Sequence, residues 1–166
     1  NFPLAQDTAT FNAASGTIGT ITIDAGWNIG TVDMTGRVVT TFPMTLSTST
    51  NTPTVYGSWL FDTGVTSSST TGTITFGGRG TQTITSRGIT FGCPVTVDSS
   101  TGTVQLADQL TLGATRTLTL TSGTFDAVTY PVSVGLATLS GGTLKMGSNT
   151  WTLSGTGAVW NFTSST

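Results

Sequence analysis

Apolar and polar residues alternate along most of this chain, and the polar position is most often a threonine. The alternation restarts repeatedly after a Gly-Thr pair, as in Gly72-Thr73-Ile74 and Gly123-Thr124-Phe125. An apolar residue at every second position is typical of a strand with one buried face, and a preceding glycine is typical of a turn. The pattern therefore predicts many short β-strands separated by tight turns.

The restarts late in the chain predict a structural repeat. Gly102, Gly123 and Gly142 are separated by 21 and 19 residues. Each interval divides into three alternating stretches. A repeat of this length, built only of strands and turns, predicts a parallel β-helix (β-solenoid) with three strands in each coil.

In such a coil the large apolar residues point toward the axis and the threonines between them point outward. The residues expected in the core are Leu106, Leu112, Leu118, Leu120, Leu144, Met146 and Leu153. The same pattern predicts earlier strands within residues 7–11, 20–24, 30–36, 38–42 and 54–61. The polar segments 45–53 and 67–71 are expected to be loops.

An antiparallel β-sandwich is the alternative architecture, because it also has short strands at similar spacing. The hairpin turns Asn-Gly and Asp-Gly, which a sandwich would favour, are absent from the chain. In either case we expect an all-β protein with a single β-rich domain over residues 1–166. Since the first residue is Asn1 rather than methionine, we expect this domain to be processed or part of a longer chain.

Composition narrows the function classes. Only 7% of the residues are charged, the net charge is −2, and about a quarter of the residues are threonine. The five cations are scattered, which disfavours a nucleic-acid surface. No apolar run has the length of a membrane helix. We therefore expect neither nucleic acid nor a membrane as a partner.

Few side chains are suited to catalysis. Cys93 is the only cysteine, and a chain without histidine offers its thiol no base, so we expect a buried, inert thiol. Asp108 and Asp126 lie about one coil apart and are the candidate pair for glycoside hydrolysis. Aspartates in loops more commonly cap turns. We expect no enzyme activity, no cofactor and no metal site.

Three aromatic residues are candidate contacts for glycans or for a neighbouring subunit: Tyr56, Trp59 and Trp160. The alternative is that they fill the core. Segment 159–162 would leave an apolar coil exposed, which a cap, a neighbouring subunit or further chain is expected to cover.

The Thr-x-Thr runs in segments 81–85 and 115–121 suggest flat hydroxyl ladders, like the ice-binding faces of antifreeze proteins. Such a face needs the motif at the same place in every coil. The runs are irregularly spaced, and Arg116 interrupts one of them. Solvent-facing strand threonines are therefore the favoured interpretation.

Two segments, LTLTSGTFDA (118–127) and LKMGSNTWTLSGTGAVW (144–160), resemble a Thr/Gly-rich repeat of predicted virion and tail-fibre-like proteins of bacteriophages. The segments DTATFNA, TIDAGWNIGTVDMTG and TVYGSWLF look like the earlier part of the same family. Similar repeats occur in bacterial surface adhesins. The resemblance carries no catalytic or metal-binding residue to this chain.

The resemblance implies a non-enzymatic, β-solenoid-like component of the virion, and therefore an extracellular location. We expect a fibre, a spike or a surface-decoration element whose partners are other virion proteins and itself, as a homotrimer. A carbohydrate-binding or adhesin module of a phage or bacterial surface, which would contact surface glycans, is the alternative. A polysaccharide depolymerase is a lesser alternative.

Overall fold

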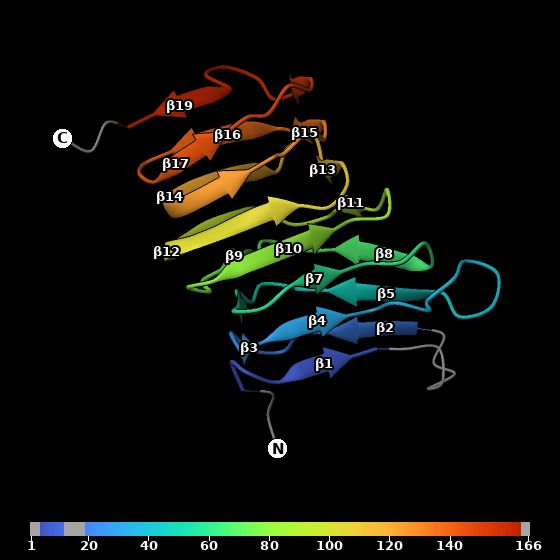
Figure 1. The fold of residues 1–166 in the computed structure, drawn as a ribbon. Helices are drawn as coiled ribbons and strands as arrows, with labels where there is room; N and C mark the ends of the chain where they lie inside the picture. Colours follow the sequence, from blue (N-terminus) through green and yellow to red (C-terminus); the bar gives the residue numbers. More distant parts are fainter. Residues whose placement is uncertain (1–3, 12–18, 164–166) are drawn as a thin grey trace.

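The computed structural model describes residues 4–11 and 19–163, and all of their regular secondary structure is β (Figure 1). The strands stack as a β-solenoid of about seven coils. The pairings described between strands are parallel, from β1 with β4 at one end to β16 with β19 at the other. The predicted parallel β-helix is confirmed, and the alternative, an antiparallel sandwich, is wrong.

Each coil contributes one strand to each of three faces, which the chain visits in the order A, B, C. Face A contains β1 (Thr8–Thr10), β4 (Thr31–Asp33), β7 (Trp59–Leu60), β10 (Thr81–Thr85), the second halves of β12 (Val95–Leu106) and β14 (Thr117–Asp126), and β17 (Thr143–Lys145). Face B contains β2 (Gly19–Thr22), β5 (Met44–Ser47), β8 (Val65–Ser68), β11 (Thr90–Phe91), β13 (Leu110–Leu112), β15 (Val132–Val134) and β18 (Trp151–Leu153). Face C contains β3 (Asn28–Ile29), β6 (Thr54–Val55), β9 (Ile74–Phe76), the first halves of β12 and β14, β16 (Leu136–Leu139) and β19 (Trp160–Phe162).

Coil length varies because the corners differ in length. Register partners are 19 residues apart at Thr124 and Thr143, but 27 apart at Val32 and Trp59. The longest coils contain excursions such as the loop before β5, which projects beyond the stack in Figure 1. Most paired strands remain in register, so the corners absorb most of the irregularity. The exceptions are a register shift between β12 and β14 around Asp98, and β8 and β11, which are not paired.

Three local predictions in the first half of the chain are wrong in whole or in part. Segment 38–42 is not a strand: the amides of Thr41 and Phe42 both bond to the carbonyl of Val38, which closes a turn, and Val39 is 65% exposed. Segment 45–53 is not entirely a loop, because its first residues belong to β5, where Leu46 points into the core. Segment 67–71 likewise begins with the end of β8.

The core is a continuous stack of the inward residues of all three faces. Leu106, Leu112, Leu118 and Leu120 are each at most 4% exposed, as predicted. Leu144 and Leu153 are only partly buried, since they lie in the last coil, where no further described coil covers them. The prediction for Met146 is wrong: it is 41% exposed, beside the corner glycine Gly147.

Several of the Gly-Thr pairs lie at the corner between faces C and A. There, a Cβ atom on Gly30 would lie 2.3 Å from the carbonyl oxygen of Asp7, and one on Gly142 would lie 2.5 Å from that of Gly123. Only glycine allows two coils to approach so closely. The glycines that predicted strand starts are therefore packing positions between neighbouring coils.

Candidate functional site

The aspartates at the corner between faces A and B bind backbone amides. Asp108 Oδ1 accepts a hydrogen bond from the Ser86 amide and Oδ2 from the Arg87 amide, both at 2.7 Å and both in the preceding coil. Two coils before Asp108, Asp62 Oδ2 accepts a hydrogen bond from the Gly36 amide at 2.8 Å. These carboxylates satisfy amides that the turn leaves without partners, so the predicted capping role is confirmed for them.

Asp108 and Asp126 lie in neighbouring coils, as their spacing predicted. Asp126 accepts a hydrogen bond from the Val128 amide at 2.8 Å and forms an ion pair with Lys145 at 3.6 Å. A glycosidase needs one carboxyl group to donate a proton and another to act as base or nucleophile. Since both carboxylates are already engaged in the corners, their arrangement favours turn capping over catalysis.

Cys93 is fully buried in the core, as predicted. Burial raises the pKa of its thiol to about 11, and the positive charge of Arg116 offsets this only in part. Since the thiolate is the reactive form, a thiol with this pKa is inert at neutral pH.

The three aromatic candidates do not form one site. Trp59 is wrong as a surface contact: it is 0% exposed, because it occupies an inward position of β7, and it packs edge-on against Phe61 at 5.6 Å. Tyr56 is 40% exposed and directly follows β6, at the end of the second coil. Trp160 lies in the last coil and stacks on Phe162, with ring centroids 5.8 Å apart.

The outward threonines form ladders, and the members of each ladder could not be identified from the Thr-x-Thr runs. On face C one column joins all seven strands through successive register pairs: Asn28, Thr54, Thr75, Thr96, Thr119, Thr138 and Asn161. Unequal coils bring these distant threonines into line, although the Thr-x-Thr runs are irregularly spaced along the sequence. The Thr-x-Thr runs themselves are not the repeating unit.

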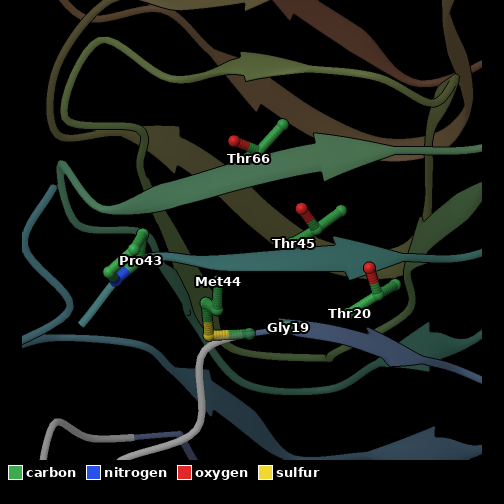
Figure 2. Close-up of a pocket in the computed structure, with 6 residues that line it drawn as sticks. All are labelled: Gly19, Thr20, Pro43, Met44, Thr45 and Thr66. Carbon is green, nitrogen blue, oxygen red and sulfur yellow. The ribbon is translucent and has the colours of Figure 1, made fainter.

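Face B carries a second set of hydroxyl columns. Thr20, Thr45 and Thr66 lie one above another on β2, β5 and β8 (Figure 2). A shallow hollow of about 240 Å³ is lined by these three threonines together with Gly19, Pro43 and Met44. A second hollow, of about 330 Å³, continues from Thr66 to Thr90. Both hollows are lined mainly by uncharged residues, and they follow the solenoid axis.

In residues 4–11 and 19–163, no three histidine, cysteine, aspartate or glutamate side chains lie close enough together to hold a metal ion. Within the same ranges, no helix is long and apolar enough to cross a membrane.

Comparison with protein-family models, with curated proteins and with solved structures found no match. The function therefore has to be argued from the fold and its surfaces.

Proposed function

We propose that this chain is a non-enzymatic structural component of a bacteriophage virion, as a fibre, a spike or a surface-decoration element. The observation that carries the proposal is that the side chains best suited to catalysis have structural roles or are buried. The carboxylates of Asp62, Asp108 and Asp126 cap corners, and the Cys93 thiol is buried with a raised pKa. Side chains that elsewhere perform chemistry here hold the coils together.

Cross-coil bonds favour a stiff element. The Gln82 side chain is buried and bonds to the carbonyls of Val55 and Gly57 at 2.9 and 2.8 Å, and to the amide of Gly78 at 2.7 Å. The Arg116 guanidinium reaches the carbonyl of Ser69 at 3.1 Å, although the two residues are 47 positions apart. Such bonds resist sliding and separation of neighbouring coils.

We further propose that the chain assembles as a homotrimer with other virion proteins as partners, and the last coil supports association with another chain. Phe162 is 68% exposed and continues the partly buried cluster of Trp160 and Trp151. With only 7% charged residues, the surface also offers little electrostatic resistance to association. Covering these rings would contribute about 25 cal/mol per Å² of apolar area.

A carbohydrate-binding or adhesin module is the second candidate, and Tyr56 is the observation that favours it. Its ring lies against Gly77: a Cβ atom built there would be 3.6 Å from the tyrosine Cε1. An aromatic ring that is 40% exposed and close to the backbone of the next coil can serve as a platform for a sugar ring. The module would contact surface glycans from an extracellular, virion-bound position.

Immuno-electron microscopy of bacteriophage particles tests the proposal. Antibodies against the purified chain are expected to label the tail or the particle surface, and sedimentation of the purified chain is expected to give a trimer. A monomer that labels no particle and cleaves polysaccharide would contradict the structural role. Loss of glycan binding in Tyr56→Ala, without a change in assembly, would instead support the adhesin.

A further inference from the structure

Face B differs from the other two faces in charge. None of the seven strands of face B contains a charged residue. Face A carries Asp33, Asp126 and Lys145 in its strands, and face C carries Asp98. Face B is therefore the one face of the described solenoid whose strands are electrically neutral along its whole length.

Every outward side chain in the strands of face B is a hydroxyl. They are Thr20, Thr22, Thr45, Ser47, Thr66, Ser68, Thr90, Thr111, Ser133 and Thr152. In β2, β5 and β8 these form two parallel columns, in which each residue is the register partner of the next. Strands β8 and β11 are not paired, so a separate column, again in register, follows on β11, β13, β15 and β18.

One of these columns, Thr20, Thr45 and Thr66, is here called the central column, and its hydroxyls make no hydrogen bond to the described part of the protein. Within the described residues, no hydrogen bond to another protein group involves the side chains of Thr20, Thr45 or Thr66. On face A, by contrast, Thr31 Oγ1 accepts a bond from the Ser58 amide at 3.2 Å. The central column of face B therefore keeps its donors and acceptors for a ligand outside the protein.

The geometry of these hydroxyls is that of a rigid lattice. Neighbouring strands lie about 4.7 to 4.9 Å apart, and alternate residues along a strand lie about 6.6 Å apart. Threonine is stiff at χ1, so each residue presents its methyl and its hydroxyl in a nearly fixed direction. Figure 2 shows the side chains of Thr20, Thr45 and Thr66 projecting from the same side of three successive strands. Water bound to such an array is held at positions that the protein fixes in advance.

We infer that face B adsorbs to ice, through water ordered on its hydroxyl columns. The two hollows beside these columns, of about 240 and 330 Å³, are open to solvent, and threonine side chains line part of each. Since one water occupies roughly 30 Å³ in the liquid, each hollow has room for several. The threonine methyl groups offer no hydrogen bonds to the water beside them. That water bonds mainly to other water, which favours an ordered layer that merges with the surface of an ice crystal.

Other ligands fit this face less well. A glycan is usually held by an aromatic platform and by amide or carboxylate groups, and a nucleic acid requires cations. The outward positions of face B contain none of these groups. The inference is independent of the proposed virion role, because it concerns one face of the solenoid and requires no other virion protein.

The test compares two threonine-to-lysine variants of the purified chain. Thr45→Lys places a long charged side chain at the centre of the block formed by β2, β5 and β8. Thr96→Lys makes the same change at the equivalent outward position of β12 on face C; both threonines are partly buried central strand residues. Thermal hysteresis and inhibition of ice recrystallisation are measured, and circular dichroism verifies the fold of each variant.

We expect the parent chain to produce thermal hysteresis and to halt recrystallisation. Thr45→Lys should lose both effects, and Thr96→Lys should retain both. Absence of both effects in the parent, or equal loss in the two variants, would overturn the inference. The parent chain is also tested for binding to crystalline chitin and cellulose. If it binds one of them, if only Thr45→Lys abolishes that binding, and if neither thermal hysteresis nor recrystallisation changes, face B binds a glycan instead. A third variant, Thr111→Ser, keeps the hydroxyl and removes a methyl, so a folded protein with reduced hysteresis is expected even if a lysine variant fails to fold.

Discussion

A Cβ atom at Gly102 would lie 2.1 Å from the carbonyl oxygen of Gly78, in the neighbouring coil. Gly102 lies at the corner between faces C and A, where its backbone packs closely against that of Gly78. Backbone lies against backbone there, with no flexible side chain to move aside. The glycine in the Gly102-Thr103 pair is therefore required by packing between coils as well as by the turn.

Gly102→Ala is expected to destabilise the fold by about 1 to 3 kcal/mol, the usual cost of forcing an extra carbon into a packed site. Gly80→Ala, at the same corner, is the matched control, because no atom lies within 4 Å of a Cβ built there. That control should be neutral or slightly stabilising. Urea unfolding of both variants measures the difference. Equal free energies of unfolding would show that the corner is looser than the structure indicates.

The inward and outward positions of β14 predict opposite sensitivities. Leu118 is 4% exposed, and Leu118→Ala should cost about 2 to 5 kcal/mol because it leaves a cavity in the stack. Thr121 is exposed on the same strand, and Thr121→Ser should change stability by less than about 0.5 kcal/mol. Thermal unfolding of the two variants is the measurement. A Thr121→Ser variant as unstable as Leu118→Ala would mean that the two sides of the strand are assigned wrongly.

Alkaline pH should weaken the fold through Cys93. Burial raises the pKa of its thiol from the ordinary value of 9.0 to about 11. Between these values the unfolded chain loses the proton and the folded chain keeps it, so stability is complete below pH 9 and falls as the pH rises toward 11. The loss is on the order of 2 kcal/mol.

Cys93→Ala separates this effect from the titration of other groups. The variant is expected to be less stable at pH 8, because a buried sulfur is removed, yet to lose less stability than the parent between pH 9 and 11. Guanidinium unfolding at several pH values measures both slopes. Identical slopes for parent and variant would show that the thiol does not titrate differently on folding.

Asp108 is expected to matter for stability rather than for chemistry. Asp108→Ala leaves the amides of Ser86 and Arg87 without their acceptors, and should cost about 1 to 3 kcal/mol. Asp98→Ala is the control, since Asp98 is exposed and accepts a bond from the Ser122 hydroxyl. Its cost should be smaller. Chemical denaturation decides between them, and a fully stable Asp108→Ala variant would remove the capping role on which the proposed function rests.

The sequence predicted the later coils closely and the earlier ones less well. The three stretches expected between Gly102 and Gly123 correspond to the second half of β12, β13 and the first half of β14, because the alternation there is regular and the coils are short. The error at 38–42 arose because Val38 and Val39 have the composition of a strand but lie in a corner excursion. Local propensity does not distinguish a β-branched residue in a strand from one in an exposed turn.

The candidate site was less predictable than the fold. Capping by the aspartates was expected from residue type, although the partner amides, 22 positions away for Asp108 and Ser86, were not. The sequence did not decide whether Trp59 is buried, because alternation places a residue on one of two sides of a strand without showing which side faces the core. The exposed Tyr56 and the buried Trp59 are only three positions apart.

By itself the sequence determined the strand character of the chain, its division into short segments, and which residues alternate with which; these follow from side-chain chemistry over a few positions. Only the tertiary structure decided which segments become neighbours. Thr20, Thr45 and Thr66 are separated by unequal stretches of chain, yet they form one column. The physical reason is that register depends on backbone hydrogen bonds and core packing between coils, while corners of different length take up the surplus residues.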